Sequence, residues 1–266
     1  MSRTRPTAAD LRALKGKRQL TMLRVMTLEE AEAAEQAGID IVSVPPELLL
    51  DPQYRDAAPS LFSMPGDNFY EIGTGDDFVR WAFRMYKASA DAVYCSASYA
   101  TIKRMADEAI PVIGHVGLIP SRRTWTGGWK AVGKTADSAI EIMKAVRALE
   151  AAGALGAEIE VVPVEVAEAI SQRTSLIMLS MGAGAGCDAQ YLFAEDVLGQ
   201  NRGHMPRHSK VYRNFAAEYD RLQAERIAAF CEFVADVSSS AYPEERHIVR
   251  MAPSELDRFI EAIDHL

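Results

Sequence analysis

The stretch "QLTMLRVMTLEEAEAAEQAGIDIVSV", residues 19–44, indicates the fold. It begins with an apolar, β-rich run at residues 19–25 and ends with a second such run at residues 39–44. Between them, Thr27 is followed three residues later by a glutamate, the pattern of a capping box at a helix start, and Gly38 is a typical helix stop. The stretch therefore predicts a strand, a helix and a second strand.

The same pattern recurs along the chain. Strands are expected at residues 19–25, 39–44, 60–64, 91–96, 111–118, 157–162, 174–180 and 189–193, with helices that include residues 27–36, 135–153 and 217–240. Eight strands that alternate with helices are typical of a (β/α)8 TIM barrel, and an open doubly wound sheet is the alternative. No linker rich in Pro, Gly or Ser divides the chain, so we expect residues 1–266 to form a single α/β domain with a C-terminal helical segment.

Composition narrows the class of protein. The chain has 266 residues, of which 48% are hydrophobic and 25% charged, and its net charge of -8 with scattered Lys and Arg argues against a nucleic-acid partner. The polar N-terminus and the lack of an apolar run near the roughly 20 residues that span a bilayer argue against a membrane protein. Three widely spaced cysteines fit reduced thiols. We expect a cytoplasmic protein that acts on a small molecule.

The segment "GGWKAVGKT", residues 127–135, contains the Gly-x-x-x-x-Gly-Lys-Thr spelling of a nucleotide-binding P-loop. A working P-loop needs a strand that delivers the chain into the glycine-rich turn. The preceding "SRRTWT", residues 121–126, is polar and basic, so no strand is expected there. We interpret the segment as a glycine-hinged surface loop.

In a TIM barrel the reactive side chains project from the carboxyl ends of the strands. The expected strand ends offer Glu160 as their single carboxylate. A carboxylate inside the apolar "AEIEVVP" must be solvated, paired or functional, so Glu160 is either an acid/base catalyst or a structural carboxylate. His115, in "GHVG", is either a site histidine or a core histidine bonded to the backbone. The other candidates at strand ends are Arg24, Ser63, Tyr94 and Ser96.

Two further segments carry weaker indications. "GAGAGCD", residues 182–188, lacks the Gly-x-Gly-x-x-Gly order, and is either an anion pocket or a tight packing turn. "RHSKVYR", residues 207–213, is basic, and we interpret it as a solvated face or a subunit contact. Gly-x-Ser-x-Gly is absent from the sequence, which argues against a serine hydrolase.

Several segments together resemble the ketopantoate hydroxymethyltransferase family of the phosphoenolpyruvate/pyruvate barrel superfamily. They are "PVIGHVGLIPS" (111–121), "GGWKAVGKTADSA" (127–139), "EVVPVEVAEAI" (160–170), "GAGAGCDAQYLFAEDVLG" (182–199), "PRHSKVY" (206–212) and "YPEERH" (242–247). The resemblance implies a homo-oligomeric (β/α)8 barrel in which Mg²⁺ holds a 2-oxo acid as its enolate while methylenetetrahydrofolate supplies a one-carbon unit. It also implies that Glu160 is the catalytic glutamate and His115 the active-site histidine.

The N-terminal third departs from the family pattern where the metal would be held. The family's "VGDS" motif becomes "VSVPPE", which places Pro45 and Pro46 at the metal-binding aspartate and the substrate-binding serine. The aspartate of "DMPF" becomes Ser63, and the lysine and glutamate of "VKxEGG" become Tyr94 and Ser96. The early "TAYD" is "TMLR" here and ends in Arg24.

These replacements remove carboxylates, the ligands that Mg²⁺ prefers, and add one cation. We therefore expect that Mg²⁺ does not bind as the family pattern implies, and that no metal is held at Pro45, Ser63 and Ser96. Instead, Arg24, Ser63, Tyr94, Ser96 and His115 are expected to bind a small anionic substrate directly.

Three interpretations of the activity remain. The chain is an altered, metal-independent enzyme that acts on a small 2-oxo acid or related carboxylate by carbon-carbon bond formation or cleavage, or it carries out the family's literal reaction, or it is a non-catalytic homologue. The first includes a lyase, isomerase or hydrolase on a different small anion, because barrels change chemistry by altering strand ends and loops.

Overall fold

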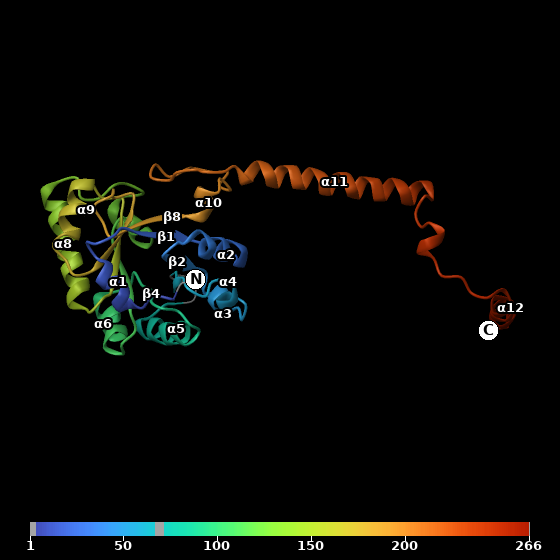
Figure 1. Cartoon of the computed structure of the whole chain (residues 1–266), viewed down its shortest axis with the longest axis horizontal. Coiled ribbons are helices and arrows are strands. Elements are labelled where there is room, and N and C mark those ends of the chain that lie inside the picture. The colour runs from blue at the N-terminus through green and yellow to red at the C-terminus, as the bar shows by residue number, and fades with distance from the viewer. Residues whose placement is uncertain (1–3, 67–71, 266) are drawn as a thin grey trace. The chain divides into compact units, whose positions relative to one another are not determined.

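The computed structural model describes residues 4–66 and 72–265, and its core is one parallel sheet (Figure 1). The strands are β1 (Leu20–Arg24), β2 (Ile41–Val44), β3 (Phe62–Pro65), β4 (Val93–Tyr94), β5 (Val112–Gly117), β6 (Gly156–Glu160), β7 (Ile177–Met181) and β8 (Ala189–Phe193). They lie in the order β3-β2-β1-β8-β7-β6-β5-β4. Because β1 pairs with β8 and every pairing is parallel, the sheet curls into a (β/α)8 TIM barrel. All eight expected strands are confirmed, and the alternative of an open doubly wound sheet is wrong.

Helices follow the strands as expected. They are α1 (Ala8–Leu14), α2 (Leu28–Ala37), α3 (Pro46–Leu50), α4 (Tyr54–Ala57), α5 (Gly75–Lys87), α6 (Tyr99–Asp107), α7 (Arg123–Thr126), α8 (Ala136–Ala151), α9 (Val164–Ser171), α10 (Ala194–Val197), α11 (Phe215–Ser239) and α12 (Pro253–Ile263). The Thr27 hydroxyl accepts the Glu30 N–H at the start of α2, as the capping box predicts, but the Glu30 carboxylate accepts the Met26 N–H instead of that of Thr27. Gly38 ends α2 in the left-handed conformation, with φ of 78°.

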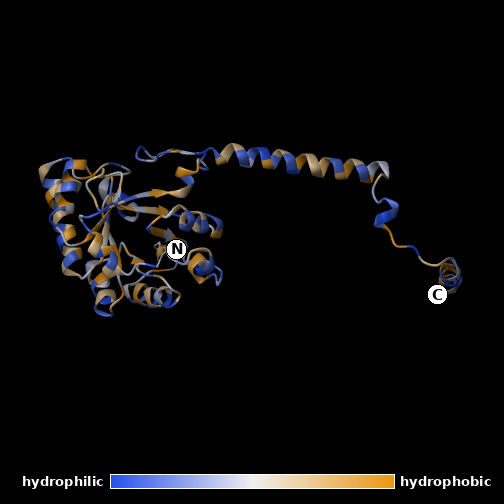
Figure 2. Ribbon diagram, in the orientation of Figure 1, coloured by the Kyte–Doolittle hydropathy of each residue, from blue (hydrophilic) through white to orange (hydrophobic). Residues whose placement is uncertain are grey.

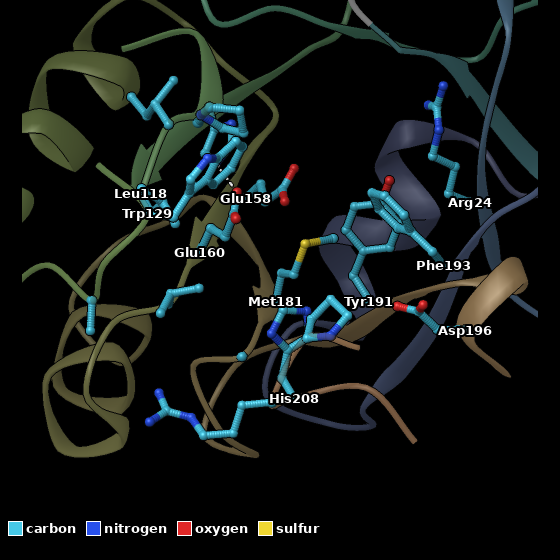
Figure 3. A pocket seen from close by; sticks show the side chains of 18 of the residues that line it. Arg24, Leu118, Trp129, Glu158, Glu160, Met181, Tyr191, Phe193, Asp196 and His208 are labelled. Carbon is cyan, nitrogen blue, oxygen red and sulfur yellow. Dashed lines mark ion pairs between the residues drawn. The ribbon is translucent and has the colours of Figure 1, made fainter. Parts of the chain in front are cut away.

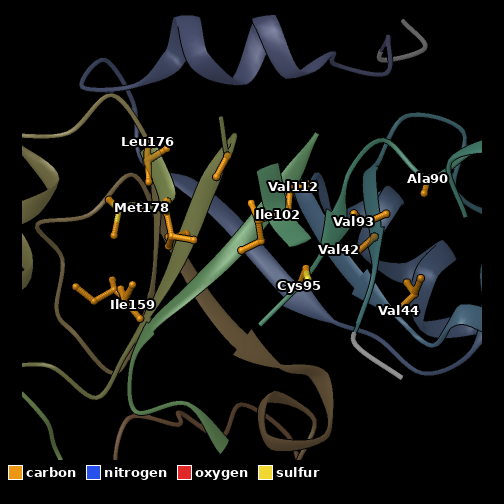
Figure 4. Close-up of a cluster of buried hydrophobic side chains, with 14 of the residues drawn as sticks. Val42, Val44, Ala90, Val93, Cys95, Ile102, Val112, Ile159, Leu176 and Met178 are labelled. Carbon is orange, nitrogen blue, oxygen red and sulfur yellow. The ribbon is translucent and has the colours of Figure 1, made fainter. Parts of the chain in front are cut away.

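The alternation of strand side chains produces two apolar layers. Ile41 belongs to the cluster inside the barrel, and the next residue, Val42, belongs to the cluster between strands and helices (Figure 4). Successive side chains of a strand point to opposite faces, so one register places every second residue inside the barrel. Leu11 of α1 packs with the inner cluster.

Side chains help to close the barrel between β3 and β4. The Asp91 N–H donates to the Ser63 carbonyl at 2.8 Å, and the Asp91 carboxylate accepts the Ser63 N–H at 2.8 Å. Arg55 pairs with the same carboxylate at 2.9 Å. These contacts join β3 to the start of β4, in place of the ladder of backbone hydrogen bonds that joins neighbouring strands elsewhere in the sheet.

The chain divides into two compact units, Met1–Arg213 and Asn214–Leu266. The first contains the barrel. The second contains the expected closing helix as α11, followed by α12, and the rings of Phe233 and Tyr242 pack 5.6 Å apart within it. Hydrophobic and hydrophilic residues are mixed along α11 (Figure 2). That both units belong to a single domain stays a prediction.

Across the described residues 4–66 and 72–265, every helix is too short or too polar to cross a membrane.

Candidate active site

A cavity of about 770 Å³ opens at the carboxyl ends of the strands. Its walls include side chains from the ends of six strands, namely Arg24 (β1), Tyr94 (β4), His115 (β5), Glu160 (β6), Met181 (β7) and Phe193 (β8). This is the end of a TIM barrel where substrates bind.

The structure brings five of the six predicted site residues together. Arg24, Tyr94, Ser96, His115 and Glu160 all line the cavity.

Ser63 is the exception, and its prediction as a substrate-binding residue is wrong. Its hydroxyl contacts Tyr54 at 2.7 Å and Arg55 at 3.2 Å, and Ser63 is absent from the cavity lining. The physical reason is the strand period: Met64 belongs to the cluster inside the barrel, so its neighbour Ser63 faces the opposite side.

His115 and Glu160 form the buried centre of the site. The imidazole Nε2 lies 3.1 Å from Oε2 of Glu160, and the other ring nitrogen, Nδ1, is hydrogen-bonded to the Tyr94 hydroxyl. Both residues are more than nine-tenths buried. The Tyr94 contact orients the ring so that its second nitrogen faces the carboxylate.

The cavity lining contains two carboxylates besides Glu160, namely Glu158 and Asp196. Glu160 is the carboxylate at the end of β6, as the sequence predicts, and Glu158 lies two residues inside the same strand. Glu158 is 5% exposed and lies beside Glu160 (Figure 3). The sequence indicates that Glu158 and Glu160 point the same way, because they are two residues apart in "AEIEVVP" and alternate residues of a strand share a face.

Arg24 lies across the cavity from the two glutamates (Figure 3). Its guanidinium donates to the Ser43 hydroxyl at 3.1 Å. Gly66 makes room for it, because a Cβ at that position would lie 2.7 Å from Nη1 of Arg24. Tyr191 lies near both charges: burial and the negative charge of Glu158 raise the pKa of its hydroxyl, and Arg24 opposes this shift. The guanidinium of Arg24 and the two glutamates thus lie on opposite sides of the cavity.

The basic segment 207–213 is expected on a solvated face or a subunit contact, and its first two residues, Arg207 and His208, line the cavity. Arg207 is exposed, as a solvated face predicts, whereas His208 is half-buried against the cavity. Burial lowers the pKa of His208, and the negative charge of Glu160 opposes this shift. Gly182, with φ of 68°, lets His208 approach, because a Cβ there would lie 2.8 Å from Nδ1 of the imidazole. The glycine-rich segment 182–188 is therefore a close-packing turn at this point.

The segment with the P-loop spelling does not follow a strand. The short helix α7 precedes it, and Thr135 caps α8 by accepting the Ser138 N–H. Trp129, Lys130 and Lys134 line the cavity. Trp129 and Lys130 are exposed, which agrees with the interpretation as a surface loop, while the mobility of this loop stays a prediction.

The positions that the resemblance implies for Mg²⁺ do not fit that ion. Pro45 and Pro46 have no side-chain ligand atom, Ser63 faces away from the cavity, and Ser96 offers only a hydroxyl. Mg²⁺ is held in proteins through carboxylates and water.

Fold and site together define a class: a TIM barrel whose cavity at the strand ends combines a cation, an imidazole and carboxylates. The family model described as ketopantoate hydroxymethyltransferase matches residues 63–245, and the chain belongs to this family.

Two proteins named 3-methyl-2-oxobutanoate hydroxymethyltransferase are similar over most of their length. That of Thermotoga neapolitana is 30% identical over 90% of this chain and 94% of its own, and that of Nitratidesulfovibrio vulgaris strain DP4 is 28% identical over 97% and 90%. Among solved structures, phosphoenolpyruvate phosphomutase from Streptomyces platensis subsp. rosaceus superposes with a TM-score of 0.51 at 17% identity, covering 98% of this chain and 96% of that one. A 2,3-dimethylmalate lyase gives 0.51 at 16% identity, covering 98% and 99%. At such low identity these two structures support the fold alone.

Proposed function

We propose that the cavity binds a small 2-oxo acid or a related carboxylate and makes or breaks a carbon-carbon bond next to the oxo group. The observation that carries the proposal is the pairing of a guanidinium and a carboxylate in one cavity: Arg24 lies across from Glu160 (Figure 3). The related enzymes named above act, by their names, on 3-methyl-2-oxobutanoate.

Each side chain has a role in this proposal. Arg24 binds the substrate carboxylate, since a guanidinium matches it with two parallel hydrogen bonds. Tyr94 and Ser96 bind the remaining polar atoms, and His115 orients Glu160. Glu160 removes or returns the proton on the carbon next to the oxo group, a step to which a positioned base contributes typically about 10²–10⁴-fold in rate.

That the activity is independent of metal ions stays a prediction. That expectation rests on the replaced family positions at Pro45, Ser63 and Ser96, whereas the cavity holds carboxylates at other positions, among them Glu158. The methylenetetrahydrofolate implied by the resemblance, the homo-oligomeric state and the cytoplasmic location likewise stay predictions.

The test is an assay of ketopantoate formation with 3-methyl-2-oxobutanoate and methylenetetrahydrofolate. Product formation supports the literal family reaction. Without product, the purified chain is screened with a panel of 2-oxo acids for exchange of the adjacent carbon-bound protons with D₂O. Exchange that depends on Glu160 supports the proposal with a different second substrate, and the absence of exchange with any 2-oxo acid contradicts it.

A further inference from the structure

Three side chains inside the barrel place their ligand atoms close together. One donor atom each from His115, Glu158 and Glu160 lies within 4.8 Å of the other two, and all three residues are buried. The backbone explains the grouping, because His115 and Glu158 are register partners on β5 and β6, and Glu160 is two residues further along β6. The cluster is therefore built on paired strands rather than on a loop.

The charges of this cluster do not balance by themselves. Two carboxylates so close together in a buried site repel each other when both are ionised. One imidazolium would supply a single positive charge against two negative ones. A divalent cation among the three ligands would neutralise both carboxylates.

The contacts of His115 suit a metal ligand. Its Nδ1 is hydrogen-bonded to the Tyr94 hydroxyl, and its Nε2 lies 3.1 Å from Oε2 of Glu160. Histidines that bind metals commonly use the second ring nitrogen in such a bond, which sets the orientation of the ring. Tyr94 thus directs Nε2 toward the two carboxylates.

The donor set also selects the kind of ion. Imidazole with carboxylates suits Mn²⁺, Fe²⁺ or Zn²⁺, whereas Mg²⁺ prefers oxygen ligands and water. Such ions lie roughly 2.0–2.2 Å from their nitrogen and oxygen ligands, so donor atoms on one ion are about 3–3.5 Å apart. Rotations of the glutamate side chains could close the present separation.

We propose that His115, Glu158 and Glu160 bind one divalent first-row transition-metal ion inside the barrel mouth, through residues other than the replaced Mg²⁺ positions. Three protein ligands leave coordination positions open toward the cavity. Glu160 has two carboxylate oxygens, one for the ion and one for proton transfer. Ion binding requires no substrate, so this inference and the proposed function can fail separately.

The experiment measures ion binding by the full chain after removal of bound metals with a chelator. Mn²⁺ titration followed by electron paramagnetic resonance is expected to show one tight site per chain, with weaker binding of Mg²⁺ in parallel equilibrium dialysis. Glu158→Gln and His115→Gln should each weaken Mn²⁺ binding by about 10- to 100-fold, and Tyr94→Phe, which removes the hydroxyl that orients His115, by about 10-fold. Glu47→Gln, which removes an exposed carboxylate outside the cavity, should leave it unchanged.

Three results would overturn the inference. The wild-type chain binds no Mn²⁺ or Zn²⁺ in stoichiometric amount, or Glu158→Gln binds Mn²⁺ as tightly as the wild type, or Mg²⁺ binds as tightly as Mn²⁺. Circular dichroism checks that each variant is folded. Should Glu158→Gln fail to fold, the wild-type stoichiometry and the Tyr94→Phe titration decide the question.

Discussion

His115 and Glu160 face each other across the ends of β5 and β6, with 3.1 Å between Nε2 and Oε2. Gly117, two residues after His115, is the register partner of Glu160, and its φ of +86° turns the chain away at that point. The Leu118 N–H then donates to the Glu160 carbonyl at 2.9 Å. The position of the carboxylate is thus determined by strand pairing and by a single tight turn.

The proposed base predicts that Glu160→Gln removes most of the proton-transfer activity while substrate still binds. We expect the rate of exchange of the protons next to the oxo group to fall by about 10²–10⁴-fold, because an amide cannot accept the proton. Deuterium incorporation followed by NMR measures the rate. Glu165→Gln, an exposed glutamate at the start of α9, is the matched control and should retain wild-type exchange. Equal rates in the two variants would contradict the role of Glu160.

The substrate-binding role proposed for Arg24 predicts that Arg24→Ala weakens substrate binding instead of slowing proton transfer. Loss of the guanidinium should weaken binding of 2-oxo acids by about 10- to 100-fold, the range for hydrogen bonds to a charged group. Arg24→Lys should recover only part of this affinity, since an ammonium lacks the planar fork that matches a carboxylate. Isothermal titration calorimetry with the 2-oxo acid and with its neutral amide separates the charge effect. Loss of affinity for both ligands alike would show that Arg24 acts on the shape of the cavity and not on the carboxylate.

The barrel could be predicted from the sequence because its determinants are local. Each strand-helix unit has its own apolar run and its own stop or cap, as Thr27 and Gly38 show for α2. The segment "GGWKAVGKT" could be separated from a true P-loop by the same local rule, since it follows α7 instead of a strand.

The site was predicted less completely, since it depends on which face of a strand a residue occupies. Ser63 was placed in the cavity because it matches a family position, but the register of β3 turns it toward Tyr54. Glu158 was missed although it shares a face with Glu160. His208 reaches the cavity only because the chain after β8 folds back against Gly182, a long-range contact that no local pattern reports.

The turn at Gly117 predicts a specific glycine requirement. A Cβ there would lie 2.4 Å from the Glu160 carbonyl oxygen, and the residue has a φ of +86°. Gly117→Ala should lower the free energy of unfolding by about 3 kcal/mol, from left-handed strain plus the clash. Gly16→Ala shares the positive φ, +70°, but meets no atom within 4 Å, and should lose only about 1 kcal/mol. Urea denaturation measures both, and equal losses would show that the contact with Glu160 does not matter.

Glu150, at the end of α8, predicts a pH dependence of stability that is separate from the cavity. Hydrogen bonds from the Ser175 hydroxyl and N–H, with help from Arg147, lower the pKa of its carboxyl group from 4.5 to about 2. A depressed pKa stabilises the folded chain above pH 4.5, and this contribution is lost as the pH falls toward 2. Glu150→Gln should therefore lower the free energy of unfolding by about 1.5 kcal/mol at pH 7, in the range of a hydrogen-bonded charge.

The difference between Glu150→Gln and the wild type should shrink steadily as the pH falls from 4.5 toward 2, because the unfolded wild-type chain then takes up a proton at this carboxyl group while the folded chain does not. Urea denaturation at a series of pH values, within the range where the chain stays folded, measures this difference. Glu141→Gln removes an exposed carboxylate that pairs with Lys144 on the same helix, and should change stability by less than about 0.5 kcal/mol at every pH. A Glu150→Gln difference that stays constant with pH would mean that the lost contacts are those of the side chain's shape and not of its charge.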